Sequence, residues 1–144
     1  VDVYVDGTGQ PLGAVPRTRW KVDSGVAVAG RTVRDEEAMK LALDTVAAVG
    51  LTGPANVQCR RDRDGRLALL EVNPRFPGSL PLTIAAGFDI PALALREAQG
   101  IHIEPLGAFR EIAVVRHWED VIIPTTAIPQ TVELGASKTR GWSP

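Results

Sequence analysis

The sequence predicts an α+β fold, in which helices pack against an antiparallel β-sheet. Apolar and polar residues alternate on both sides of two glycine-containing turns, at residues 7–9 and 64–65, and each pattern is typical of a β-hairpin. Residues 35–49 instead repeat their apolar positions with the period of an amphipathic helix. Strands and helices do not alternate one for one, so a doubly wound parallel sheet is disfavoured.

The elements are expected in the following order. The first hairpin takes up residues 1–22, and the helix that follows has acidic residues in its first turn and Gly50 at the position of a left-handed cap. Two strands then form the second hairpin. Two short helices begin at Ser79 and Asp89, and residues 110–123 form a long last strand.

The length and composition describe one ordinary globular domain. The 144 residues are 44% hydrophobic and 23% charged, which allows a hydrophobic core without disulfide bonds. We expect the domain to cover residues 1–123. Residues 124–144 carry three prolines and no clear period, which is typical of an arm or connector. Residues 1–6 already resemble a strand and include no initiator methionine, so we expect them to belong to a longer chain.

The charge balance narrows the range of partners. The net charge of −1 argues against a nucleic acid partner and against an acidic membrane surface. No apolar run reaches the length of a membrane span. The single cysteine, Cys59, cannot form an intramolecular disulfide, which fits a reducing, cytoplasmic location. A homo-oligomer is left open.

The second hairpin is expected to bring polar side chains together. A two-residue turn at residues 64–65 would set Gln58 opposite Glu71 and Asn56 opposite Asn73 in the antiparallel ladder. Facing residues project from the same side of a sheet, with their Cβ atoms about 5 Å apart. A three-residue loop would shift the register and separate these pairs, so the expectation depends on the turn.

The converging groups suit magnesium and phosphate. Glu71 and the amides of Gln58 and Asn73 offer hard oxygen ligands, while the planar guanidinium of Arg75 matches the geometry of a phosphate group. Magnesium is usually bound by one or two carboxylates together with substrate phosphates, whereas a calcium site would need more carboxylates. Pro74 ends the ladder because it has no N–H. The alternative interpretation is a solvated ion pair beside an Asn-Pro turn.

The stretch "GPANVQCRRDRDGRLALLEVNPRFPGS", residues 53–79, resembles the C-terminal half of an ATP-grasp domain. The likeness is to the carbamoyl-phosphate-synthase-like and carboxylate–amine ligase members, and it extends over residues 1–123. It implies the C-terminal lobe of an ATP-grasp fold, with ATP and Mg²⁺ (or Mn²⁺) as cofactors. The resemblance also implies an N-terminal lobe in the same chain. Residues 1–144 alone are therefore expected neither to bind ATP tightly nor to catalyse the reaction.

The resemblance assigns roles to individual residues. Gln58, Glu71 and Asn73 would bind the metal ions that bridge the ATP phosphates, and Asn73 would also contact the nucleotide. Arg75 would be the catalytic residue that contacts the phosphoryl group in transfer. Arg17 and Arg19 share one face of a strand, where they could bind the nucleotide phosphates or a substrate carboxylate, or could simply be solvated.

The implied reaction joins a small-molecule carboxylate to an amine. The carboxylate attacks the γ-phosphate of ATP to give an acylphosphate, which an amine or similar nucleophile then displaces. The alternative is a non-catalytic binding or interaction module that keeps the same sheet. A ligase requires Gln58, Glu71, Asn73 and Arg75 on an open face, whereas a Glu71 carboxylate buried in a closed ion pair would favour the module.

Overall fold

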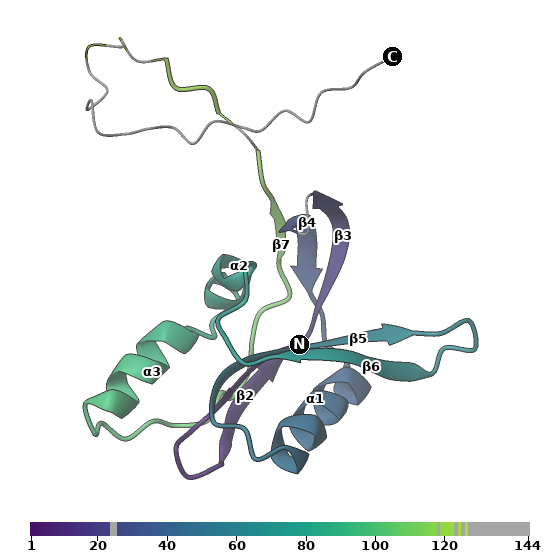
Figure 1. Ribbon diagram of the computed structural model, residues 1–144, viewed down its shortest axis with the longest axis vertical. Coiled ribbons are helices and arrows are strands. Elements are labelled where there is room, and N and C mark those ends of the chain that lie inside the picture. Colours follow the sequence, from purple (N-terminus) through teal and green to yellow (C-terminus); the bar gives the residue numbers. More distant parts are fainter. Residues whose placement is uncertain (24–25, 118, 123, 125, 127–144) are drawn as a thin grey trace, which may run out of the picture.

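The computed structural model describes residues 1–23, 26–117, 119–122, 124 and 126. Within these residues the chain forms two antiparallel sheets and three helices, which confirms the predicted α+β class (Figure 1). The elements in chain order are β1 (Asp2–Val5), β2 (Pro11–Val15), β3 (Arg17–Asp23), β4 (Val26–Thr32), α1 (Glu36–Ala48), β5 (Gly53–Arg61), β6 (Leu67–Asn73), α2 (Leu80–Ala85), α3 (Ile90–Ala98) and β7 (Ala113–Val115).

The two sheets have different positions in the molecule. The central sheet has the strand order β2-β1-β5-β6, and it forms the body together with the helices. The second sheet, with the order β3-β4-β7, projects from that body and is called the arm below (Figure 1). The β5–β6 hairpin extends sideways from the body, so the base of the arm and this hairpin lie at adjoining edges of the fold (Figure 1).

Alternating side chains of the central sheet build two hydrophobic cores. Val3 and Val5 of β1 face α1, where they pack with Val57 and with Ala42 of the helix. The opposite face of the sheet packs against α2, α3 and the loops around them. Tyr4 belongs to that second core, with Leu12, Val15, Ala86, Phe88, Ile90 and Phe109. The period of two in β1 therefore places helices on both faces of this sheet.

Helix α1 begins and ends where the sequence predicts. The Asp35 carboxylate accepts a hydrogen bond from the backbone N–H of Ala38 at 3.0 Å, which makes Asp35 the N-cap. Gly50 follows the helix with φ of 63°, a left-handed conformation that glycine adopts without strain. In α3, Asp89 caps Ala92 N–H at 3.1 Å as expected, whereas Ser79 makes no side-chain cap bond to α2.

Two expectations about strands are wrong, and one strand is unexpected. The first hairpin was expected to use residues 1–22 as two strands, but Pro16 separates β2 from β3, and β3 pairs in the other sheet. Strand β4 was not anticipated. The long strand expected over residues 110–123 is limited to β7 where it is described, because β7 pairs only with residues 29–31 of β4. Positions 118 and 123 of that expected strand lie outside the described residues.

The helices of the described residues are short. The longest is α1, with 13 residues. In this part of the chain no helix has both the length and the apolar composition to cross a membrane.

Candidate functional site

The expected turn of the β5–β6 hairpin is wrong, yet the expected pairing is confirmed. Asp62 N–H donates to Arg66 O at 2.9 Å, and Gly65 N–H donates to Asp62 O at 3.1 Å, so three residues form the loop instead of two. Gly65 has φ of 81°, the left-handed position of this loop type. Near the loop the ladder is shifted by one residue, with Cys59 paired to Leu69.

A β-bulge then restores the predicted register. The ladder pairs Cys59 with Leu69 and Gln58 with Glu71, so Leu70 is the extra residue on β6. Beyond the bulge, Asn56 pairs with Asn73, as predicted. Gln58 and Glu71 consequently project from the same face of the sheet, which a three-residue loop without the bulge would have prevented.

Glu71 lies on an open face. Its side chain is exposed, and its Oε1 accepts a hydrogen bond from Asn73 Nδ2 at 2.8 Å. Because Asn73 donates through its amide nitrogen, its amide oxygen is left as an acceptor. Glu71 takes part in none of the ion pairs found among the described residues. The closed ion pair that would favour a non-catalytic module is therefore not formed in this part of the chain.

A tight turn at Pro74 brings Arg75 next to this group. The backbone N–H of Arg75 donates to Asn73 O at 2.8 Å, which closes a turn around the single proline. The exposed Arg75 side chain donates through Nη1 to Phe76 O at 3.1 Å. Its guanidinium therefore keeps further donors for a ligand.

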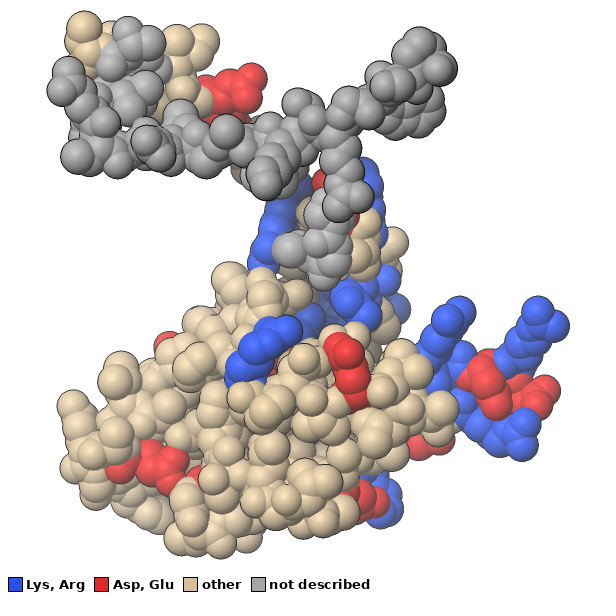
Figure 2. Space-filling model, in the orientation of Figure 1, with Lys and Arg blue, Asp and Glu red and all other residues tan. Residues whose placement is uncertain are grey.

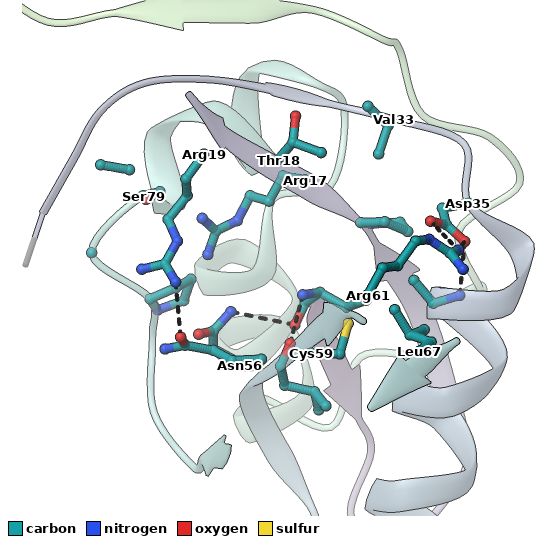
Figure 3. A pocket seen from close by; sticks show the side chains of 18 of the residues that line it. Arg17, Thr18, Arg19, Val33, Asp35, Asn56, Cys59, Arg61, Leu67 and Ser79 are labelled. Atoms are coloured by element: carbon teal, nitrogen blue, oxygen red, sulfur yellow. Dashed lines mark hydrogen bonds and ion pairs between the residues drawn. The ribbon is translucent and has the colours of Figure 1, made fainter. Parts of the chain in front are cut away.

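A cleft of about 430 Å³ lies between the arm and the central sheet (Figure 3). Its lining includes Arg17 and Arg19 of β3, Gln58 and Arg61 of β5, and Arg75, so arginines from both sheets border it. Glu71 and Asn73 do not line it. In Figure 2 basic side chains also gather on the arm, the tip of the β5–β6 hairpin carries both basic and acidic side chains, and the body below is mostly uncharged. The cleft is thus the more cationic part of the site, whereas Glu71 and Asn73 lie outside its lining and supply a carboxylate and an amide.

Arg19 connects the arm to the site. Its Nη2 donates to Oε1 of Gln58 at 3.1 Å, a contact that joins β3 to β5 across the cleft (Figure 3). The side chain of Arg19 is exposed. Arg19 thus lies beside one of the three expected metal ligands.

Arg17 has a different environment, which the sequence did not indicate. Its Nε and Nη2 donate to the two carboxylate oxygens of Asp2 at 2.8 and 2.7 Å, with side-chain exposures of 8% for Arg17 and 0% for Asp2. The Asp2 carboxylate also accepts from Asn56 Nδ2 at 2.8 Å and from the hydroxyl of Thr83. Two of the Arg17 nitrogens are therefore bound within the protein, and nucleotide binding by Arg17 stays a prediction.

An ion-pair network closes the far end of the cleft. Arg61 donates to both carboxylate oxygens of Asp35 at 2.9 and 2.8 Å and to Glu37 at 2.5 Å. The hydrogen bonds from Arg61 lower the pKa of Asp35, even though partial burial acts in the opposite direction. This network ties the first turn of α1 to the end of β5, and the position of β5 sets that of Gln58.

The donor set fits a magnesium ion that also binds phosphate. No group of three or more His, Cys, Asp or Glu side chains capable of holding a metal occurs among the described residues. A cation here would use one carboxylate, Glu71, and the amide oxygens of Gln58 and Asn73. Magnesium commonly takes one or two carboxylates and completes its shell with water and substrate phosphates. The guanidinium groups of Arg19 and Arg75, which both border the cleft, are suited to bind those phosphates.

The site combines a carboxylate and an amide of β6, an amide of β5 and the guanidinium of Arg75, which follows β6. Comparison with known families assigns this lobe to a class of ATP-binding, ligase-type domains. A family model described as "ATP-grasp in the biosynthetic pathway with Ter operon" matches residues 1–121, and the chain belongs to this ATP-grasp family. No curated protein matches the chain.

Proposed function

We propose that this lobe binds the phosphates of ATP through magnesium ions and helps to activate a carboxylate as an acylphosphate for attack by an amine or similar nucleophile. The reaction class is carbon–nitrogen ligation of the carbamoyl-phosphate-synthase type. The substrates are a small-molecule carboxylate and an amine. The N-terminal lobe of the ATP-grasp domain supplies the remaining nucleotide contacts, and Mn²⁺ can replace Mg²⁺.

The observation that carries the proposal is the pairing of Gln58 with Glu71, next to Asn73 and just before Arg75. In the proposed site Gln58, Glu71 and Asn73 hold the metal. The metal, when bound, neutralises charge on the phosphates during transfer. The exposed position of Glu71, outside any ion pair of the described residues, supports a ligand-binding role over that of a closed structural pair.

Arg75 is the proposed catalytic residue. Its planar guanidinium binds the phosphoryl group as this group passes from ATP to the carboxylate. In that step a carboxylate oxygen forms a bond to the γ-phosphorus, the bond from the γ-phosphorus to the bridging oxygen breaks, and ADP leaves. The amine then attacks the acyl carbon and displaces inorganic phosphate. Arg19 and Arg75 border the same cleft, so both can contact the anionic groups that these steps bring together.

The substitution Glu71→Gln in the full-length protein tests the proposal. It removes the only carboxylate of the metal-binding set, and it should abolish magnesium-dependent ATP hydrolysis without altering the circular dichroism spectrum, because Glu71 is exposed. Glu104→Gln is the matched control, since Glu104 is an exposed acid that contacts His102 at 2.9 Å on a loop away from the site. Hydrolysis that persists in Glu71→Gln at the level of Glu104→Gln would refute the ligase assignment.

A further inference from the structure

One oxygen atom has two competing uses in this site. Gln58 Oε1 accepts the hydrogen bond from Arg19 at 3.1 Å, and the same amide oxygen is the group that would bind a divalent cation. A guanidinium has donors only, so the amide end that faces Arg19 is the oxygen and not the NH₂ group. Arg19 and a cation therefore require the same atom of Gln58.

The backbone keeps Arg19 within reach of that oxygen. Arg19 pairs with Gly30 in the β3–β4 ladder, and the register shifts directly after Arg19. At Gly30 the strands approach so closely that an added Cβ would lie 2.5 Å from Thr18 O, which explains the glycine. Two residues earlier, Arg17 is tied to the buried Asp2. Arg19 thus directly follows a part of β3 that is held to the body by Arg17 and to β4 by the close approach at Thr18, and its side chain spans the cleft from there.

We propose that Arg19 is a positioning residue that couples cation binding to nucleotide binding. While Arg19 donates to Gln58 Oε1, one of the two acceptor positions of that oxygen is taken and a positive charge lies beside it, so a divalent cation alone binds weakly. The polyphosphate of a nucleotide attracts the guanidinium and the cation together, because both are cationic and both bind phosphate oxygens. Arg19 then moves from Gln58 to the phosphates, and Gln58 turns to the metal. The inference rests on the metal site proposed above.

The test measures Mn²⁺ affinity in the full-length protein by electron paramagnetic resonance, without nucleotide and with ATP. Arg19→Met removes the charge and the hydrogen bond while keeping a long side chain. The matched control is Arg31→Met, because Arg31 is an arginine on the neighbouring strand β4 that lies 5.7 Å from the ring of Trp20. Both variants lose one positive charge from the arm, but only the first frees Gln58.

Arg19→Met should raise the affinity for Mn²⁺ alone about tenfold, the size of one hydrogen bond to a charged group. In the presence of ATP, Arg19→Met should no longer bind Mn²⁺ more tightly than the wild-type protein, because the variant also lacks the guanidinium that binds the phosphates. Arg31→Met should leave both affinities within about twofold of the wild-type values. Arg19→Lys keeps the positive charge and a hydrogen-bond donor group, and its affinity for Mn²⁺ alone should be as weak as that of the wild-type protein.

Two results would overturn the inference. Equal gains in Arg19→Met and Arg31→Met would mean that only the net charge of the arm matters, and no gain in Arg19→Met would mean that Arg19 does not compete for Gln58. The variant Glu71→Gln separates this outcome from a failure of the proposed function. If Glu71→Gln weakens Mn²⁺ binding while Arg19→Met changes nothing, the metal site stands and the coupling fails. If Glu71→Gln also changes nothing, the metal site itself is wrong.

Discussion

Gln58 and Glu71 face each other across β5 and β6 because a bulge at Leu70 compensates for the extra residue in the loop between these strands. The extra residue in the loop and the extra residue at the bulge thereby offset each other, and the register at the site is that of a regular hairpin. Bulges re-aim side chains at functional positions, and here the bulge keeps Glu71 on the face that carries Gln58. The metal-binding group of the proposed ligase depends on this local irregularity of β6.

The buried ion pair between Asp2 and Arg17 should be important for stability. Asp2→Asn would leave the guanidinium of Arg17 buried without its counter-charge, and breaking such a pair typically costs about 3–5 kcal/mol. We expect a loss of this size in the free energy of unfolding, measured by urea denaturation. The cluster also joins β1 to the arm and to α2, so the loss should be seen by probes of both sheets.

An exposed pair provides the control for this prediction. Lys40 and Asp44 form an i,i+4 pair at 2.5 Å with side-chain exposures of 75% and 64%. Such pairs contribute little, so Asp44→Asn should change the free energy of unfolding by no more than about 0.5 kcal/mol. Similar losses in the two variants would contradict the structural role given to Asp2.

Tyr4 should ionise only at alkaline pH well above its usual range. Burial, and then the hydrogen bond from its hydroxyl to Glu97 at 2.5 Å, raise the pKa of Tyr4 in the folded protein. Above the unfolded pKa of about 10, the unfolded chain loses this proton while the folded chain keeps it, so the stability falls as pH rises. Tyr4 is the only tyrosine of the 144 residues, and its ultraviolet absorbance therefore reports this ionisation directly.

Two variants separate the causes of this shift. Glu97→Gln removes the negative charge near the hydroxyl, so Tyr4 should ionise at a lower pH than in the wild-type protein but still above the unfolded value. Tyr4→Phe has no hydroxyl group to ionise. Its free energy of unfolding, measured by urea denaturation, should therefore fall less between neutral and alkaline pH than that of the wild-type protein. A folded protein whose tyrosine titrates like that of the unfolded chain would show that this contact is not formed.

Local signals in the sequence predicted much of the fold. Helix α1 follows from its apolar period, the cap at Asp35 and the glycine at position 50, all of which act within a few residues. Local alternation also predicted the β1–β2 and β5–β6 pairings, although not the break at Pro16 or the length of the second loop. Strand β4 escaped prediction because "VAVAGRT" offers small apolar residues without a clear polar alternation, and the pairing that defines it comes from β3 and β7.

The strand pairing at the candidate site was predicted from a turn that the structure does not have. The prediction of Gln58 opposite Glu71 assumed a two-residue turn, whereas the structure uses a longer loop and a bulge. Leu69 and Leu70 are identical residues, so the sequence offers no local mark of which one is extra. What selects the register is burial, since Val57 and Val72 pack on the core face only when Glu71 and Gln58 share the other face.

The cluster around Asp2 could not be read from the sequence. Its members Arg17, Asn56 and Thr83 are 15, 54 and 81 residues away along the chain, and no local pattern connects them. In the sequence Asp2 is one polar residue in an alternating strand, which is typical of a solvated face. The structure instead buries it completely, because donors from three other elements converge on its carboxylate.

The position of the metal relative to Glu71 is the most direct test of the account. We would crystallise the full-length protein with Mn²⁺ and a non-hydrolysable ATP analogue and locate the manganese by anomalous diffraction. The account predicts a peak within coordination distance of Glu71 and of the amide oxygens of Gln58 and Asn73, with Arg75 against the terminal phosphate. Manganese bound to the nucleotide elsewhere, with Glu71 and Gln58 free of it, would contradict the account.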